Sequence, residues 1–188
     1  MRRKDREMNP DFAREVIDQS SYGSLALYDP DKKQTYSVNL SLVRLGDCLY
    51  FHSAKAGYKL DLLKEGDSYG LSFVSYAQVP DVFSRDKLQA LAQEPGKVGL
   101  LLSRVFTTEY SSAHVLGRLR LVRDPEEITR AMEALCKKYT GDKMDFFPQA
   151  MAVGGSRILV YALDIQEIHG KRKKLDAQGE EMKWQRMD

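Results

Sequence analysis

The 188-residue sequence is poor in features that would assign it to a special class of protein. Its two cysteines, Cys48 and Cys136, are too few for a disulfide framework and are expected to be small buried thiols. No apolar run approaches the ~20 residues that cross a bilayer, and no apolar segment follows the basic N-terminus as in a signal peptide. We therefore expect a soluble cytoplasmic protein without a membrane partner.

An excess of charge of one sign is missing as well. The 29 basic residues are nearly balanced by 27 acidic ones, so the net charge of +2 does not require nucleic acid as a partner. The run 171–174 (Lys-Arg-Lys-Lys) is a local exception. It is typical of a solvated tail, and as a binding surface it would support only weak, salt-sensitive contacts. We expect one globular domain over residues 1–188, with a polar, basic tail from Gly170.

Several catalytic and binding motifs are also missing. The chain contains neither G-x-G-x-x-G nor G-x-x-x-x-G-K-[ST], so Rossmann dinucleotide-binding proteins and P-loop proteins are set aside. The histidines, His52, His114 and His169, lie far apart without metal-ligand spacing, so no metal site is expected. No Ser-His-Asp or Cys-His arrangement indicates a nucleophilic enzyme.

The sequence does contain a series of short apolar runs separated by turn residues. They predict strands at about 23–28, 35–45, 48–52, 69–75, 105–122 (one strand or a pair) and 157–169. Helices are expected at about 10–20, 57–65 and 124–141. This order predicts an α+β fold, in which an antiparallel sheet forms a small barrel with peripheral helices.

Capping residues mark the expected helix starts. Asn9-Pro10 and Asp124-Pro125 each place a capping side chain before a proline at the first helical position. Residues 77–103 are the least regular region of the chain. There, Ser84 is a candidate cap for a short helix, and 98–102 (Val-Gly-Leu-Leu-Leu) fits either a packed segment or a strand edge.

The segment 49–63 carries the strongest functional signal. Its apolar run ends at His52-Ser53-Ala54, and Gly57 then opens a short amphipathic helix with Lys59 in the first turn. Backbone N–H groups at a helix start, together with a lysine, form a natural seat for a phosphate or another anion. An ordinary strand-turn-helix junction without a ligand would show the same pattern. His52 is therefore either a ligand contact or a strand-end histidine with a structural role only.

Ordered motifs run along nearly the whole chain. They are 1–8 (MRRKDREM), 22–26 (YGSLA), 46–61 (GDCLYFHSAKAGYKLD), 72–74 (SFV), 106–112 (FTTEYSS), Gly117, 124–127 (DPEE) and 168–171 (IHGK). Together they resemble the flavin-binding split-barrel proteins related to pyridoxamine 5′-phosphate oxidase, and within them the nitroimidazole-resistance (Nim) group. The Phe-His-Ser-Ala motif with its Gly-x-Lys is the most specific part.

The resemblance implies an antiparallel split β-barrel that binds FMN. It further implies a homodimer with two FMN molecules at the subunit interface, each touched by both chains. The strand expected beside the isoalloxazine ring contains Tyr36, Ser37, Val38, Asn39 and Leu40. The residues expected along the ribityl chain and ring edge are His52, Ser53 and Ala54, and Lys59 corresponds to the phosphate-binding lysine. A further strand near the cofactor contains Tyr110, Ser111 and Ser112, and the last strand brings Lys171 toward the ring.

The implied activity is that of an FMN-dependent oxidoreductase, which passes electrons to a small acceptor such as a nitroaromatic compound. His52 would orient a group or donate a proton near the reacting edge of the ring. A non-catalytic protein that stores or senses flavin is one alternative, and a split barrel that holds heme or a deazaflavin is another. Pyridoxamine phosphate oxidation is disfavoured, because the strongly basic substrate-binding C-terminus of true oxidases is not recognisable.

Two features depart from the pattern of the resembling proteins. Relatives commonly have Val-Pro-Leu where this chain has Val38-Asn39-Leu40. Residues 77–103 also look longer than the corresponding stretch in many Nim-like proteins. We expect an insertion there, which beside the flavin would reshape or cover the substrate side.

Overall fold

The computed structural model describes residues 3–183. Residues 1–2, which open the first motif of the resemblance, and 184–188, at the end of the expected tail, lie outside this part. The chain divides into two compact units. We call residues 20–73 and 114–168 the central unit, and residues 3–19, 74–113 and 169–183 the terminal unit.

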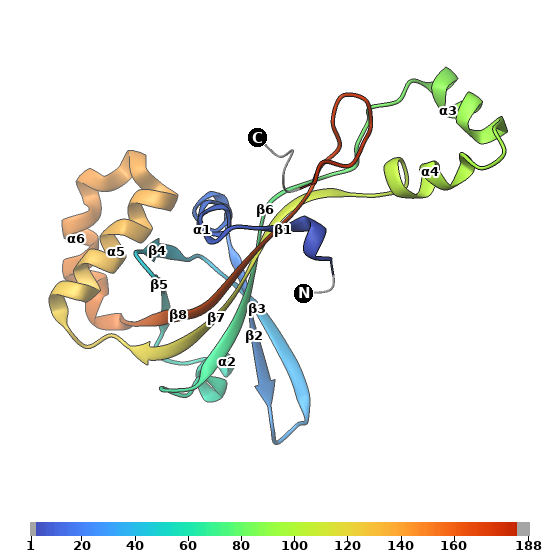
Figure 1. Ribbon diagram of the computed structural model, residues 1–188. Helices are drawn as coiled ribbons and strands as arrows, with labels where there is room; N and C mark the ends of the chain where they lie inside the picture. Colours follow the sequence, from blue (N-terminus) through green and yellow to red (C-terminus); the bar gives the residue numbers. More distant parts are fainter. Residues whose placement is uncertain (1–2, 184–188) are drawn as a thin grey trace. The chain divides into compact units, whose positions relative to one another are not determined.

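The strands of the chain belong to one antiparallel sheet (Figure 1). Within residues 3–183 they are β1 (Glu7–Met8), β2 (Gly23–Asp29), β3 (Gln34–Leu40), β4 (Val43–Leu45), β5 (Cys48–Ala54), β6 (Ser68–Gln78), β7 (Glu109–Leu121) and β8 (Ile158–Lys173). Their order is β3-β2-β6-β7-β8-β5-β4, with β1 paired to β8. β3 and β4 end this order, so the sheet is open. The single-domain organisation stays a prediction.

The helices are named in Figure 1 in chain order. They are α1 (Pro10–Gln19), α2 (Tyr58–Leu62), α3 (Arg85–Gln93), α4 (Val98–Arg104), α5 (Pro125–Thr140) and α6 (Phe147–Gly154), with 3-10 turns at Lys4–Arg6, Gly141–Phe146 and Gly155–Arg157. The caps expected at Asn9, Ser84 and Asp124 are confirmed, because each side chain accepts a backbone N–H of its own first helical turn. No helix within residues 3–183 is long and apolar enough to span a membrane.

The sheet and its surrounding helices confirm the predicted α+β class, but several boundaries differ. The expected strand 35–45 is divided into β3 and β4. At the break, the backbone N–H of Leu42 donates to Tyr139 Oη, and the Leu42 carbonyl accepts from Tyr139 Oη and Lys138 Nζ. Side chains of α5 therefore satisfy the backbone groups of Leu42.

Three further segments differ from expectation. Residues 98–102 belong to helix α4 and not to a strand. Helix α2 ends at Leu62, so it is a single turn and shorter than the predicted 57–65. Strand β8 continues past the predicted end at His169 as far as Lys173, because β1 pairs with it at Gly170 and Lys171. The basic run 171–174 is therefore not a simple solvated tail, and Lys173 is only 5% exposed.

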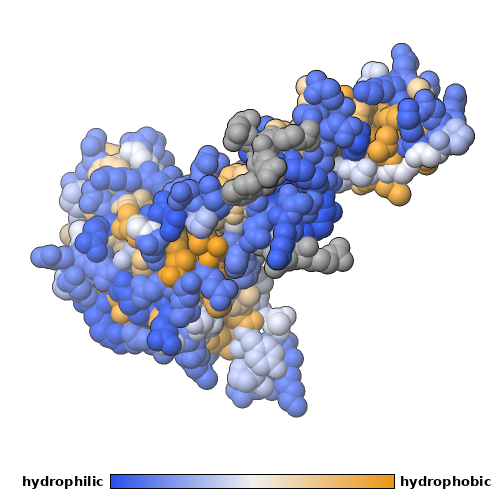
Figure 2. Space-filling model, viewed as in Figure 1, coloured by the Kyte–Doolittle hydropathy of each residue, from blue (hydrophilic) through white to orange (hydrophobic). Residues whose placement is uncertain are grey.

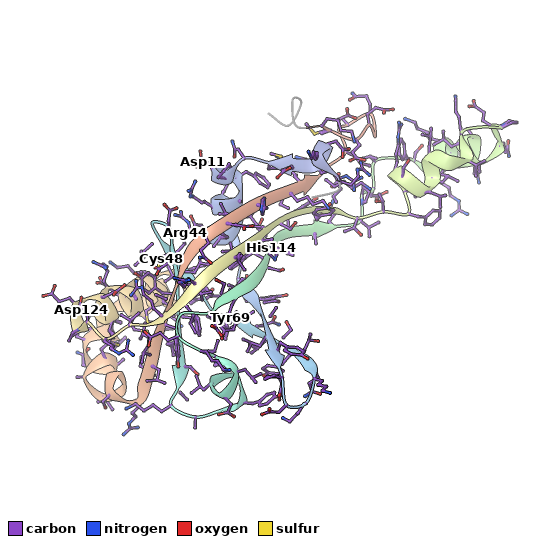
Figure 3. All side chains as sticks on the ribbon, turned by 60° about the horizontal axis from the view of Figure 1, so that its bottom comes forward. Asp11, Arg44, Cys48, Tyr69, His114 and Asp124 are labelled. Carbon is purple, nitrogen blue, oxygen red and sulfur yellow. The ribbon has the colours of Figure 1, made fainter. Side chains whose placement is uncertain are left out.

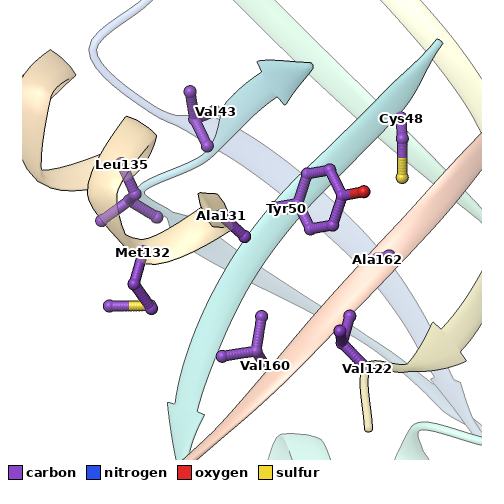
Figure 4. Close-up of a cluster of buried hydrophobic side chains, with 9 residues drawn as sticks. All are labelled: Val43, Cys48, Tyr50, Val122, Ala131, Met132, Leu135, Val160 and Ala162. Atoms are coloured by element: carbon purple, nitrogen blue, oxygen red, sulfur yellow. The ribbon is translucent and has the colours of Figure 1, made fainter. Parts of the chain in front are cut away.

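The central unit has its core between the sheet and helix α5. Figure 4 shows part of this core, in which buried side chains from β4, β5, β8, α5 and the residue after β7 meet. Its members are Val43, Cys48, Tyr50, Val122, Ala131, Met132, Leu135, Val160 and Ala162. On β2, Gly23 lies so close to Phe73 and Leu42 that a Cβ atom would come within 2.5 Å of the Phe73 ring. This position therefore excludes any larger residue.

The terminal unit contains helix α1, the α3–α4 segment and the end of β8. Two charged residues are buried where the α3–α4 segment joins the sheet. Glu109 accepts hydrogen bonds from Tyr76 Oη at 3.0 Å and from the backbone N–H of Leu175 at 2.6 Å. Lys173 Nζ donates to the Ser103 carbonyl at 3.3 Å and to Thr107 Oγ1. These bonds tie the last strand to the base of the α3–α4 segment.

Candidate functional site

The end of β5 and the short helix α2 form the junction predicted to bind an anion. β5 ends at Ala54, and Gly57, with φ of 135°, turns the chain into α2. Only glycine adopts this backbone conformation readily, so the turn explains the glycine. Lys59 lies in the only turn of α2 and is half-buried. Since α2 is so short, an anion here would depend on Lys59 and nearby N–H groups more than on a helix dipole.

The positive charge of Lys59 acts on His52. Partial burial of the imidazole, followed by the positive charge of Lys59, lowers the pKa of His52. His52 is therefore mainly neutral at neutral pH, and its ring offers one hydrogen-bond donor and one acceptor. Lys59 makes no ion pair with another residue of the described chain. This lysine is thus available to an external anion.

Strand alternation divides the predicted residues of β5 between two faces. His52 and Ala54 lie on the solvent-facing side of the strand, where the His52 imidazole is partly covered, whereas Ser53 is 4% exposed and points into the protein. The Ser53 side chain therefore cannot line an exposed site in this chain, although its backbone can. The side chains of these three predicted residues therefore do not all lie on one face of β5.

Strand β3 shows the same alternation. Ser37 and Asn39 are exposed, Tyr36 and Val38 are half-buried, and Leu40 is 7% exposed. Ser24 on β2 donates its hydroxyl hydrogen to Asn39 Oδ1 at 2.6 Å. Because the amide oxygen is occupied in this way, the Nδ2 group of Asn39 is oriented as a hydrogen-bond donor away from Ser24. Asn39 thus stands where relatives commonly have proline and adds a polar group to the strand.

A cluster around Asp29 fixes helix α2 to the β2–β3 hairpin. Tyr58 Oη donates to Asp29 Oδ2 at 2.5 Å, and Lys32 Nζ lies 4.1 Å from the centre of the Tyr58 ring. The rings of Tyr58 and Tyr36 meet edge to face at 5.1 Å. The Tyr58 hydroxyl, followed by the backbone N–H of Lys32, lowers the pKa of Asp29 to about 2. The Asp29 carboxylate is therefore charged, and it holds Tyr58, the residue that precedes Lys59. Sequence reasoning did not identify this cluster.

An open cavity of about 1050 Å³ lies beside this cluster. Its walls come from the β2–β3 hairpin, helix α2 and the start of β6, where Tyr69 is labelled in Figure 3. Tyr28, Tyr58 and Lys32 also line it. The residues that the resemblance assigns to flavin are not among those that line this cavity. Its lining contains both lysines and aspartates, so its charge favours neither anionic nor cationic ligands.

The remaining predicted residues lie in the terminal unit. Lys171 Nζ is 5.9 Å from the centre of the Tyr110 ring, and Ser112 Oγ donates to the Lys171 carbonyl at 3.5 Å. Ser111 lines a smaller cavity. The structure thus brings Tyr110, Ser112 and Lys171 together, and their role at a cofactor stays a prediction. The predicted residues form two groups, one in each unit.

A charged network also joins the sheet to helix α5. Arg120 donates to Glu127 through two nitrogens, at 2.6 and 3.0 Å, and Tyr50 Oη donates to the same carboxylate at 2.6 Å. Because these groups join β5, β7 and α5 and are satisfied by each other, we interpret them as structural. Among residues 3–183 there is no group of three or more His, Cys, Asp or Glu side chains that could hold a metal ion.

The family model described as pyridoxamine 5′-phosphate oxidase matches residues 10–172, which is most of the chain. The chain belongs to this family. No curated protein sequence matches it significantly. The resemblance found in the motifs is therefore confirmed at the level of this oxidase-related family.

Solved structures share the fold of this family member. A candidate 5-nitroimidazole antibiotic resistance protein from Bacteroides thetaiotaomicron is 17% identical, with a TM-score of 0.64 over 88% of this chain and 86% of that one. A flavocytochrome from Azotobacter vinelandii is 14% identical, with a TM-score of 0.63 over 93% and 70%. The FAD and heme binding protein from Mycobacterium smegmatis is 17% identical, with a TM-score of 0.62 over 90% and 73%. The Nim-like resemblance is thus confirmed as a similarity of fold.

Proposed function

We propose that this family member is a flavin-binding protein, with FMN as the cofactor, and that it acts as an oxidoreductase on a small acceptor such as a nitroaromatic compound. The observation that carries the proposal is the junction of β5 and α2, where Lys59 has no ion-pair partner among the described residues and lies near a neutral His52. Family membership and the flavin-binding neighbours support it. The split-barrel form is consistent with the open sheet.

In this proposal each residue has a defined task. Lys59 would bind the phosphate through a charge-assisted hydrogen bond. Asn39, with its oxygen held by Ser24, would donate from Nδ2 to a carbonyl of the ring. Neutral His52 would orient a group or exchange a proton at the ring edge. The flavin, when bound, supplies the electron transfer, and the chain supplies binding, orientation and exclusion of water.

A homodimer with flavin between its subunits is part of the same proposal. The predicted residues fall in two groups on different units, and an interface can bring one group of each chain to the same ligand. Large side chains on β2 and β6 are exposed in the single chain, with Tyr28 at 56% and Val74 at 55%. Burial of such side chains against a second copy would favour association. Sedimentation with and without FMN measures this assembly.

The first experiment is the visible spectrum of the purified protein, followed by denaturation and identification of what is released. Flavin bands with FMN in the supernatant would support the proposal, and FAD would correct the identity of the cofactor. A Soret band would favour the second candidate, a heme protein, which the FAD and heme binding neighbour suggests. A colourless protein that takes up neither flavin nor heme would contradict both.

Catalysis requires a separate test, because a flavin store or sensor would have the same spectrum. NADPH or NADH oxidation with a nitroaromatic acceptor, measured against the rate with free FMN, separates these functions. A rate no higher than that of free FMN would leave a non-catalytic flavin protein.

Lys59→Ala tests the phosphate anchor directly. We expect this substitution to weaken FMN binding by about 1–3 kcal/mol, because one charge-assisted hydrogen bond is lost. Lys55→Ala is the matched control, since Lys55 is an exposed lysine only four residues earlier. Fluorescence titration of FMN into both variants provides the measurement. Equal affinities of the two variants would show that Lys59 is not the anchor.

A further inference from the structure

Strand β8 is followed by a short hairpin, residues 174–182, which we call the C-terminal hairpin. Leu175 and Glu181 pair as an antiparallel bridge, and the backbone N–H of Gly179 donates to the Asp176 carbonyl at 2.9 Å across the turn. In Figure 1 this hairpin, coloured red, lies beside the connections that lead to α3 and α4. Its own hydrogen bonds give the hairpin a defined shape, so it can act as one body.

The C-terminal hairpin contacts both connections of the α3–α4 segment. Gly179, with φ of 79°, packs directly on the ring of Phe83, which precedes the cap residue of α3 and is 9% exposed. A Cβ atom at Gly179 would overlap this ring. At the other connection, Arg104, the last residue of α4, is paired with Glu180 through both terminal nitrogens, one of them 2.6 Å from its acceptor oxygen. One short element therefore touches the segment where it leaves the sheet and where it returns.

The N-terminal segment holds the same hairpin. Arg6 donates to the Glu181 carboxylate from Nε at 2.6 Å and from Nη2 at 2.9 Å, and these side chains are 15% and 18% exposed. Lys183 Nζ lies 3.1 Å from the same carboxylate and 2.7 Å from that of Asp5. Glu180 and Glu181 are neighbours in the chain, so the α3–α4 segment and the N-terminal segment are joined through two consecutive carboxylates.

The α3–α4 segment depends on such contacts at its base. Helix α3 has 9 residues and α4 has 7, and neither contains a buried residue. Isolated helices shorter than ~12–15 residues are marginal in water, and most helices are stabilised by packing. The Ser103 carbonyl near the end of α4 also accepts from Lys173 Nζ, at 3.3 Å, directly before the hairpin. The last strand and the hairpin thus hold the end of α4 together.

We propose that the C-terminal hairpin is an ionic latch for the α3–α4 segment. With the hairpin docked, the base of the segment is fixed, and with the hairpin released, the segment swings as a lid about its connections at 79–84 and 105–108. Salt weakens contacts between partly exposed charges, so it favours the released state, whereas the burial of apolar side chains does not depend on these charges. The inference does not rest on flavin binding, although a lid hinged next to Tyr110 would change the cover of a flavin bound there.

Hydrogen-exchange mass spectrometry of the full-length protein tests the coupling. Arg6→Gln removes the charged contact to the hairpin, and we expect exchange about threefold to tenfold faster at 175–182 and also at 104–108, because the end of α4 loses its support. Arg14→Gln is the matched control, since Arg14 pairs with Asp11 inside helix α1 of the same unit, and it should change neither region. Faster exchange at the hairpin without faster exchange at 104–108, or no change at either, would overturn the proposal.

A second variant and added salt separate a latch from general loosening. Glu180→Gln removes the charged contact to Arg104 and should accelerate exchange at 104–108, and adding Arg6→Gln should then have little further effect, because the latch is already open. Raising NaCl from about 0.1 M to about 1 M shortens the Debye length from ~10 Å to ~3 Å and should accelerate exchange at 104–108 in the unmodified protein much more than in Glu180→Gln. Additive effects of the two substitutions would overturn the proposal, as would equal acceleration within α5, which would indicate global unfolding.

Discussion

Helix α5 and the α3–α4 segment both contain apolar residues at helical spacing, but they use them differently. In α5, Ala131, Met132 and Leu135 are at most 7% exposed and pack against the sheet (Figure 4). Neither α3 nor α4 has a buried residue, and Leu102 is 72% exposed. Figure 2 shows apolar surface, in orange, on the α3–α4 segment. Since helices in proteins derive most of their stability from packing, α5 should be far more stable than α3 or α4.

The two regions also differ in how polar side chains attach them. Glu127 at the start of α5 accepts from both Arg120 and Tyr50, which lie on two strands of the sheet. The α3–α4 segment is attached mainly at its end, where Arg104 donates to Glu180 at 2.6 Å. The comparison shows that sequence periodicity identifies a helix without indicating how firmly the fold holds it.

Leu135→Ala should produce the largest effect. We expect a loss of about 2–5 kcal/mol in the free energy of unfolding, because a buried side chain leaves a cavity. Leu102→Ala is the matched variant in α4 and should change stability by less than about 0.5 kcal/mol, since the side chain is already in solvent. Urea unfolding of both proteins measures the difference. Similar losses would mean that α4 is buried in solution and would break the comparison.

Glu127→Gln tests the polar attachment of α5. The Arg120 guanidinium, acting with Tyr50 against partial burial, holds the pKa of Glu127 at about 2, below its usual 4.5. We expect a loss of about 1.5–3 kcal/mol at neutral pH, typical of hydrogen bonds to a charged group. A lowered folded-state pKa stabilises the fold above pH 4.5, and this contribution disappears as the pH falls toward 2.

The difference between Glu127→Gln and the unmodified protein should therefore shrink during acidification. Urea midpoints measured across this pH range test the prediction. Glu126→Gln is the neighbouring control, because Glu126 is exposed and lies outside the network. A pH-independent difference would show that the carboxylate charge is not what matters.

The smallest effects concern the helix caps. Asp124→Ala should cost about 1 kcal/mol of global stability, because the cap belongs to a packed helix. Ser84→Ala should leave the global unfolding midpoint almost unchanged while accelerating amide exchange within α3, because α3 can open locally. Hydrogen-exchange mass spectrometry reports both changes. Slow exchange throughout α3 that resists Ser84→Ala would indicate packing that the single chain does not provide.

Local rules predicted the helix starts well. A capping side chain acts within its own first turn, so Asn9, Ser84 and Asp124 could be identified without tertiary information. Residues 98–102 were harder, because a short apolar run fits a strand or a helix equally. The end of β8 was missed because its basic composition resembles a tail, whereas pairing with β1 keeps it in the sheet.

The candidate site was predictable only in part. The motif around His52 and Lys59 predicts a strand end followed by a glycine that opens a short helix, and the structure has the glycine turn at Gly57. Alternation within β3 and β5 was not applied to the carried-over residues. The side chains of Ser53 and Leu40 are buried, so their expected place beside the ligand stays a prediction that only their backbone groups could meet in this chain. The Asp29–Tyr58 contact joins residues 29 positions apart and therefore could not be derived from local spacing.

That contact has a consequence for genetics. Because Asp29 fixes Tyr58, and Lys59 is the next residue, a substitution at Asp29 would move the lysine without touching any ligand. A screen for loss of anion binding would recover Asp29 variants together with those of Lys59. In a family alignment, position 29 of the hairpin and position 58 of α2 should consequently vary as a pair, and their covariation would look like a binding signature.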